Sequence, residues 1–211
     1  MQIIGKRSLS SRLWLNRQLK DVYVKQARDG GYRSRAVFKL MEIDDKFRII
    51  KNTKCIIDLG AAPGSWCQLL SQRSSDTAKI VAIDLLDFSA VEKVQQFVGN
   101  FEDEKNQVKI MDYLRQKADL IVSDMASATS GHAQTDHLRI MQLACGAYSF
   151  AQNALQEGGS FVTKIFQGGR EKAFFENIKK DFQKARFFKP KASRNLSSEI
   201  YIVATGFKTC N

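Results

Sequence analysis

The chain has 211 residues, of which 44% are hydrophobic and 10% aromatic, a composition that suits one compact domain and excludes a disordered chain. Its 33 Lys and Arg residues against 22 Asp and Glu residues give a net charge of +11, which argues against an acidic enzyme of small metabolites and indicates a polyanionic partner. No run of 18 apolar residues occurs, so no membrane span is expected.

The N-terminal segment is strongly basic. Residues 1–39 carry ten Lys or Arg residues and two Asp residues, a net charge of +8. Towards the end of this segment, apolar residues at helical spacing from Ala36 to Ile43 predict a helix that Ser34 opens.

Two predicted strands and a glycine-rich loop come next. The apolar runs 54–59 and 79–84 predict buried strands, and Asp58-Leu-Gly-Ala-Ala-Pro-Gly-Ser-Trp66 forms the loop after the first. The small residues of this loop let a ligand approach the backbone, although the loop is neither a P-loop nor a strict G-x-G-x-x-G motif. Asp84 ends the second strand, where a carboxylate accepts hydrogen bonds from ribose hydroxyls. This combination favours an adenosyl ligand, as in nicotinamide enzymes and in S-adenosylmethionine (SAM) enzymes.

The second half of the chain continues the alternation of strands and helices. The elements predicted there are a weak strand at 108–110, a strand at 119–124, a helix at 135–156, a strand at 159–166, a helix around 174–182, and strands at 186–189 and 199–205. Residues 40–163 have a net charge of −4, whereas residues 164–194 carry ten basic and three acidic side chains, a net charge of +7. Two basic segments around one core favour a groove for a polyanion over a merely solvated surface.

The order of the predicted elements indicates the fold class. Strands that alternate with helices predict an α/β fold, in which a parallel sheet has helices on both faces and ligands bind beyond the carboxyl ends of the strands. The four cysteines form no C-x-x-C pair, which suits reduced thiols in the cytosol. We therefore expect a cytoplasmic protein without a membrane partner, and a monomer.

Several short motifs together resemble one known family. These motifs are G-Y-R-S-R-A at 31–36, F-K-L at 38–40, G-A-A-P-G-S-W at 60–66, S-D-M-A at 123–126, S-G at 130–131, K-I-F-Q-G at 164–168 and S-E-I-Y-I-V-A-T-G at 198–206. Their order and spacing resemble the FtsJ/RrmJ (RlmE) family of SAM-dependent ribosomal RNA large subunit 2′-O-methyltransferases. The resemblance extends from about residue 11 to residue 207.

The resemblance implies a fold, a division of the chain and a reaction. It implies a Rossmann-like SAM-dependent methyltransferase fold with a mostly parallel, seven-stranded sheet. Residues 51–211 would form this methyltransferase domain as one compact unit, and residues 1–50 a basic, helical RNA-binding segment. The implied reaction is SAM-dependent methylation of the ribose 2′-oxygen of a uridine in the A loop of 23S rRNA, in the large ribosomal subunit.

The resemblance also implies four catalytic residues. The Lys-Asp-Lys-Glu tetrad of the family falls on Lys39, Asp124, Lys164 and Glu199. The sequence itself singles out Lys164, because a lysine inside the apolar run Ser-Phe-Val-Thr-Lys-Ile-Phe is costly to bury without a partner. We take Lys164 as the hypothetical base that removes the proton of the attacking hydroxyl. Glu199 opens the last strand and would lie at the same sheet edge if that strand were antiparallel.

The remaining implied contacts concern the cofactor and RNA. The positions that match SAM contacts of the family are Gly60, Gly64, Trp66, Asp84, Asn100 and Asp124. Asn100 stands where the family commonly has Asp, and it keeps an acceptor oxygen. The residues expected to meet RNA phosphates, or to stack on a base in the case of the tyrosine, are Arg12, Arg17, Lys20, Lys25, Arg28, Tyr32, Arg33, Arg35 and Arg194.

Three alternatives remain open at the level of sequence. The motifs do not exclude a 2′-O-methyltransferase of tRNA or of mitochondrial rRNA. A nicotinamide oxidoreductase is disfavoured, because the Y-x-x-x-K pair of Tyr113 and Lys117 precedes a strand in the wrong place for that site. A non-catalytic RNA-binding protein is disfavoured by the complete tetrad. His132 and His137 flank Asp136 without fixing three ligands, so no metal site is expected.

Overall fold

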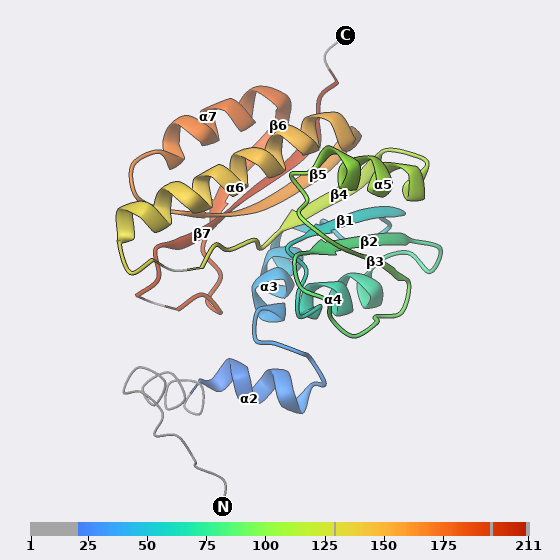
Figure 1. The fold of residues 1–211 in the computed structure, drawn as a ribbon, viewed down its shortest axis with the longest axis horizontal. Coiled ribbons are helices and arrows are strands. Elements are labelled where there is room, and N and C mark those ends of the chain that lie inside the picture. Colours follow the sequence, from blue (N-terminus) through green and yellow to red (C-terminus); the bar gives the residue numbers. More distant parts are fainter. Residues whose placement is uncertain (1–20, 129, 195, 210–211) are drawn as a thin grey trace, which may run out of the picture.

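The computed structural model describes residues 21–128, 130–194 and 196–209, which form one seven-stranded sheet in the order β3-β2-β1-β4-β5-β7-β6 (Figure 1). The strands are β1 Cys55–Leu59, β2 Lys79–Asp84, β3 Val94–Val98, β4 Ala118–Ser123, β5 Leu155–Phe166, β6 Phe182–Phe188 and β7 Glu199–Phe207. The helices within the described residues are α2 Val22–Asp29, α3 Val37–Phe47, α4 Ser65–Arg73, α5 Glu104–Leu114, α6 Ala133–Ala154 and α7 Glu171–Asp181.

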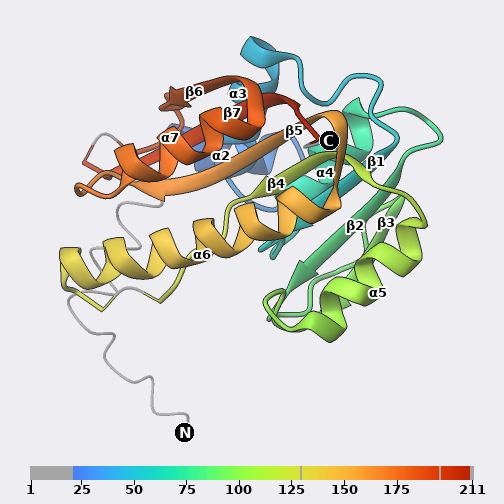
Figure 2. The same ribbon diagram turned by 90° about the horizontal axis from the view of Figure 1, so that it is seen from above.

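The first five strands are parallel, and β7 runs antiparallel between β5 and β6. Helices cover both faces of the sheet, as Figure 2 shows. This arrangement confirms the predicted Rossmann-like, mostly parallel sheet.

Alternating side chains of β1 show how the core is divided between the two faces. Ile56 packs with residues of α3 and α4, whereas Cys55, Ile57 and Leu59 pack in the cluster that contains α5, α6 and α7. The period of two along the strand sends successive side chains to opposite faces, so a strand covered on both sides reads as a continuous apolar run. The first strand was recognisable from sequence for this reason.

The predicted strand at 108–110 is wrong, because these residues lie in α5. Ile110 and Leu114 are buried one helical turn apart, while Val108 is 51% exposed, which is the pattern of an amphipathic helix. The third strand is β3 instead, and two of its five residues are glutamines. Its half-buried side chains give too weak an apolar pattern for prediction from sequence.

The described part of the N-terminal segment packs onto the fold. Helix α3 shares the apolar cluster of Ile56 and Val122, so α3 packs directly against the sheet. Ala36 is the N-cap of α3, and Ser34 only accepts a 3.3 Å hydrogen bond from its backbone nitrogen. The division of the chain at residue 51 stays a prediction. No helix among the described residues is long and apolar enough to cross a membrane.

Candidate active site

Three strands bring polar side chains to one edge of the sheet. Asp124 follows β4, and Lys164 lies near the carboxyl end of β5. Because β7 is antiparallel to β5, its first residue, Glu199, pairs with Phe166 at the end of β5. Lys39 reaches the same place from α3.

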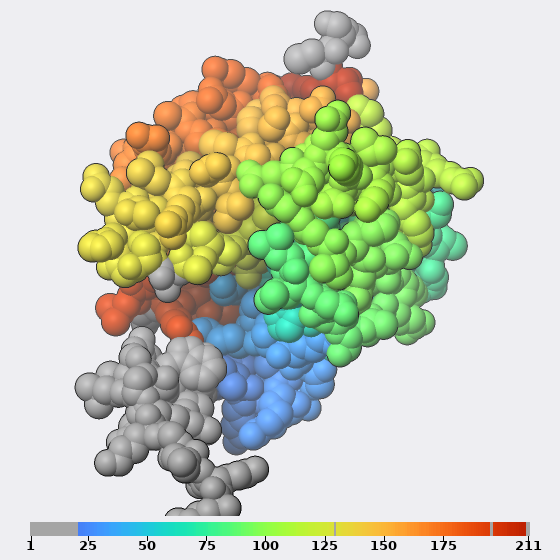
Figure 3. Space-filling view, viewed as in Figure 1, coloured from blue at the N-terminus to red at the C-terminus, as the bar shows by residue number. Residues whose placement is uncertain are grey.

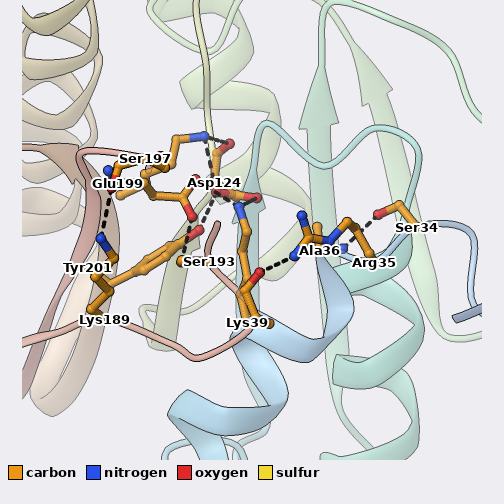
Figure 4. Close-up of polar contacts among 12 residues, drawn as sticks. Ser34, Arg35, Ala36, Lys39, Asp124, Lys189, Ser193, Ser197, Glu199 and Tyr201 are labelled. Carbon is orange, nitrogen blue, oxygen red and sulfur yellow. Dashed lines mark hydrogen bonds and ion pairs between the residues drawn. The ribbon is translucent and has the colours of Figure 1, made fainter. Parts of the chain in front are cut away.

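The four side chains form a network in which positive and negative groups alternate. Figure 4 shows Lys39 together with its partners Asp124 and Glu199. Lys39 Nζ lies 2.8 Å from Glu199 Oε2 and 3.8 Å from Asp124 Oδ2. Lys164 Nζ lies 3.1 Å from Asp124 Oδ1 and donates a 2.7 Å hydrogen bond to the Asp124 carbonyl. Two cations and two carboxylates balance, which offsets the cost of burying these charges. We call this group the tetrad network.

Tyr201 joins the tetrad network from β7. Its hydroxyl donates a 2.7 Å hydrogen bond to Asp124 Oδ1. Burial, followed by the negative charge of Asp124, raises the pKa of Tyr201 well above its ordinary value, so the phenol stays a neutral donor. Sequence reasoning missed this residue, although it stands two positions after Glu199 and so shares its side of the strand.

Asp124 is the centre of the tetrad network. Burial opposes its ionisation, but the positive charges of Lys164 and Lys39, together with hydrogen bonds from Tyr201 and Lys164, outweigh that effect and hold the pKa of Asp124 below its ordinary value. Its side chain therefore remains a carboxylate between two lysines.

Ser193 holds the outer end of the tetrad network, and no sequence motif pointed to it. Its hydroxyl donates a 2.7 Å hydrogen bond to Glu199 Oε1, and both residues are buried. The other carboxylate oxygen of Glu199 is thereby directed to Lys39.

The substitution Ser193→Ala is expected to lower the free energy of unfolding by about 1–3 kcal/mol, because it leaves a buried carboxylate oxygen without its donor. Urea denaturation measures this loss. Ser149→Ala, at an exposed position of α6, is the control and should change stability by less than about 0.5 kcal/mol. Equal stabilities for the two variants would show that the Ser193 contact contributes nothing.

A cavity of about 290 Å³ lies beside the tetrad network, beyond the carboxyl ends of β1, β2 and β4. Gly60, Asp84, Asn100 and Asp124 line it, so the structure brings four of the six predicted cofactor residues together. The carboxylate of Asp84 is held by two backbone N–H groups, since Oδ2 accepts from Ala62 and Oδ1 from Leu86, each at 2.9 Å.

Gly60 allows two loops to meet at the floor of this cavity. Its φ is +77°, and a Cβ atom there would lie 2.5 Å from Met125 Cγ and 2.9 Å from Met125 Cα. Any side chain would therefore push the Asp124–Met125 segment away from the loop after β1.

The two other predicted cofactor residues, Gly64 and Trp66, do not line the cavity. The Trp66 side chain is buried in the apolar cluster that contains α3 and α4. There Nε1 donates a 2.8 Å hydrogen bond to the Ala36 carbonyl, and the ring packs against Tyr201. Gly64 is the N-cap of α4. What these positions can offer a ligand is the first-turn N–H groups of α4, because such groups lack intrahelical acceptors.

The predicted RNA contacts divide into three groups. Arg12, Arg17 and Lys20 lie outside the described residues. Lys25, Arg28 and Arg194 are exposed.

Tyr32, Arg33 and Arg35 instead make contacts within the protein. The Tyr32 hydroxyl donates to Gln72, and its ring packs against Phe38. Arg35 pairs with Asp21 at 3.0 Å and also donates to the Ala192 carbonyl. Arg33 donates to three backbone carbonyls. A one-dimensional pattern of positive charge could not reveal that these groups are already paired.

An open groove of about 690 Å³ runs between the two basic segments. The lining residues are Asp21, Tyr23, Arg35, Lys191, Ser193, Arg194, Leu196 and Ser197. One lining residue, Ser193, is the hydrogen-bond partner of Glu199.

Asp58 is a buried carboxyl group below the glycine-rich loop, which sequence reasoning did not single out. It is 1% exposed, and its Oδ2 accepts a hydrogen bond from the Cys67 thiol at 3.1 Å, while Oδ1 has no partner among the described residues. Burial raises the pKa of Asp58 to about 7.

The raised pKa of Asp58 predicts that the fold loses stability between about pH 4 and pH 7. Between these pH values the folded state keeps the proton on Asp58, whereas the unfolded chain has released it. The contribution of Asp58 to the free energy of unfolding is therefore fully present at low pH and is lost as the pH rises to about 7. A pKa change of this size corresponds to roughly 4 kcal/mol. Asp58→Asn removes the titration, and its urea midpoint, compared with that of the wild type at pH 5 and pH 8, should fall less. Parallel pH dependences of the two proteins would refute the prediction.

Comparisons with known proteins agree in naming one family. The sequence matches the FtsJ-like methyltransferase family over residues 32–207. The ribosomal RNA large subunit methyltransferase E of Bradyrhizobium diazoefficiens is 47% identical over 207 residues, which are 97% of this chain and 91% of that protein. The protein of the same name from Gluconobacter oxydans is 49% identical over 202 residues, 96% of this chain and 75% of that protein.

Solved structures agree with the fold. A crystal structure of a Plasmodium falciparum protein assigned as a ribosomal RNA methyltransferase has a TM-score of 0.75 and 31% identity, and the match covers 83% of this chain and 98% of that chain. An rRNA methylase from Streptococcus thermophilus has a TM-score of 0.52 at 12% identity, covering 80% of this chain and 95% of that chain, and is similar in fold alone.

Proposed function

The chain belongs to the FtsJ-like methyltransferase family, and we propose that it uses SAM to methylate the ribose 2′-oxygen of a uridine in the A loop of 23S rRNA, within the large ribosomal subunit. The names of its relatives support ribosomal RNA of the large subunit as the substrate. The choice of the 2′-oxygen and of the uridine follows from the motif resemblance and is part of the proposal.

One observation carries the proposal: the tetrad network lies at the rim of the cavity, and Asp124 belongs to both. A reacting group held over Asp124 would therefore be within reach of the cavity's ligand and of Lys164 at the same time. Holding two reactants in this way makes their reaction effectively intramolecular.

The residues around the cavity fit SAM. The Asp84 carboxylate has a fixed orientation and suits the paired hydroxyls of a ribose, and the exposed Leu86 offers apolar surface for an adenine ring. Asn100 brings an amide to the same wall, and Asp124 carries a negative charge for the amino end of the ligand. When bound there, SAM supplies an activated methyl group.

The tetrad network handles the proton of the attacking hydroxyl. We assign Lys164 as its acceptor, because this side chain is buried next to the cavity and is held by Asp124. Its ammonium group must first release one proton to solvent, since only the neutral amine has a lone pair that can take the proton of the hydroxyl. Asp124 stabilises the lysine as it becomes positive. Lys39 pairs with Glu199 and also lies 3.8 Å from Asp124 Oδ2, so it places a positive charge between the two carboxylates.

The groove between the basic segments suits an RNA strand. Arg194 and Lys191 are exposed beside it and can meet phosphates, while the groove floor leads to Ser193 and the tetrad network. An RNA backbone lying in this groove would bring a ribose close to Lys164.

The proposal is tested with a panel of substrates and radiolabelled SAM. Large subunits from cells lacking this enzyme, free 23S rRNA and unmodified tRNA are compared, and binding of SAM and of NADH is measured by calorimetry. We expect SAM binding, no NADH binding, and methyl transfer to the large subunit. Transfer to tRNA alone, or binding of SAM without transfer to any of the RNAs, would refute the assignment of the substrate.

A further inference from the structure

Arg33 differs from the exposed basic residues of the N-terminal segment because three backbone carbonyls hold its guanidinium group. Nη1 donates to the carbonyls of Pro63 at 3.1 Å and Ser89 at 2.6 Å, and Nη2 donates to that of Ala90 at 2.7 Å. The group also lies 5.9 Å from the centre of the Phe88 ring. Its donors are thus directed into the protein.

These carbonyls belong to the two loops that bound the cavity. Pro63 lies in the loop after β1, whose residues Gly60 and Ala62 line the cavity. Ser89 and Ala90 lie in the segment after β2, which begins with the lining residues Leu85 and Leu86. One side chain therefore joins both loops.

The glycine-rich loop is shaped around this side chain. A Cβ atom on Gly64 would lie 2.5 Å from Arg33 Nη1 and 2.8 Å from the Phe88 ring. The missing side chain of Gly64, whose φ is +95°, therefore makes room for Arg33 as well as permitting the turn. This contact explains why Gly64 is part of the loop although it does not line the cavity.

The backbone next to Arg33 is also fixed to the cofactor side of the fold. Its N–H donates a 2.9 Å hydrogen bond to Gln68 Oε1 on α4, and Gln68 Nε2 donates a 3.0 Å hydrogen bond to the Gly31 carbonyl. In the space-filling view, the blue N-terminal residues lie directly against the green part of the surface (Figure 3). Residues 31–33 thus join the N-terminal segment to the walls of the cavity.

We propose that Arg33 is a positioning residue for the cofactor pocket, which fixes the two loops that bind SAM and does not contact RNA. The inference rests on the proposed function, since it takes SAM as the ligand of the cavity. A guanidinium group presents five N–H donors in a planar fork, so it can satisfy three carbonyls at once, whereas a lysine ammonium cannot span them. Without these bonds the loops sample other arrangements, and apparent affinity falls with the fraction of molecules in the binding-competent arrangement.

The test separates cofactor binding from RNA binding. SAM affinity is measured by calorimetry without RNA, and affinity for large-subunit rRNA is measured without SAM over a range of salt concentrations. Arg33→Met is expected to weaken SAM binding about tenfold or more, to leave kcat at saturating SAM within about threefold, and to leave RNA affinity and its salt dependence unchanged. Arg33→Lys, which keeps the charge and is milder for folding, should give an intermediate SAM affinity.

Arg28→Met is the matched control, because Arg28 is exposed on α2 and 79% of its side chain is accessible. It should leave SAM affinity unchanged, weaken RNA binding and lower the salt slope by about one. Wild-type SAM affinity in both Arg33 variants would overturn the inference, and weaker RNA binding in the same variants would make Arg33 an RNA contact. Failure of the wild type itself to bind SAM would instead overturn the proposed function.

Discussion

Lys164→Met is expected to reduce methyl transfer about 1000-fold, while SAM still binds with an affinity within a few-fold of the wild type. Methionine fills nearly the same space in β5 but cannot accept a proton. Asp124 keeps Tyr201 and Lys39 as partners in this variant, so the cavity wall should stay in place. The measurement is single-turnover methyl transfer to large subunits, together with calorimetric titration of SAM.

A second lysine provides the control for this experiment. Lys109→Met replaces an exposed lysine on α5 and should leave turnover within about twofold. Near-normal turnover in Lys164→Met would rule out Lys164 as the proton acceptor. A loss of SAM binding equal to the loss of turnover would show that the lysine acts on the cofactor site instead.

Asp124→Asn is expected to lower the free energy of unfolding by about 3–5 kcal/mol, because it leaves two lysines close together without the carboxylate between them. Lys164, only 6% exposed, would then keep the Asp124 backbone carbonyl as its acceptor and lose its counter-charge. Turnover should fall as severely as in Lys164→Met, since Asp124 also lines the cavity.

A double-mutant cycle with Lys39→Met, followed by urea denaturation, distinguishes the loss of the counter-charge from other effects of Asp124→Asn on stability. Removing one lysine relieves the repulsion that Asp124→Asn creates, so the double variant should be more stable than the sum of the two single losses by about 1 kcal/mol or more. Strictly additive losses would contradict the assignment of Asp124 as the shared counter-charge. A stability of Asp124→Asn within about 0.5 kcal/mol of the wild type would do the same.

The parts of the fold that are buried on both faces could be predicted from sequence, and the edge of the sheet could not. Strands such as β1, in which Asp58 is the one charged residue, appear as nearly continuous apolar runs because helices cover both of their faces. The edge strand β3 has glutamines at two of its five positions, and its apolar signal was weaker than that of α5. A prediction from apolar content alone therefore assigned the third strand to residues 108–110, which lie in α5.

For the candidate site, the sequence predicted which residues meet but not the contacts that each side chain makes. The motifs predicted which residues would meet at the carboxyl edge of the sheet, and the structure brings Lys39, Asp124, Lys164 and Glu199 together there. Their catalytic roles stay predictions. The motifs could not show that the Trp66 ring faces α3 or that Arg33 is already paired, because the direction of a side chain depends on tertiary packing. Ser193 escaped notice for the same reason, since its partner lies across a turn of the chain.

The most direct test of the account is a map of 2′-O-methylation on large-subunit rRNA from cells that lack this protein, complemented with the wild-type chain or with Lys164→Met. We predict that one A-loop uridine loses its methyl group in the deletion strain, regains it with the wild type, and stays unmethylated with the variant. An rRNA methylation map that is unchanged by the deletion would contradict the account.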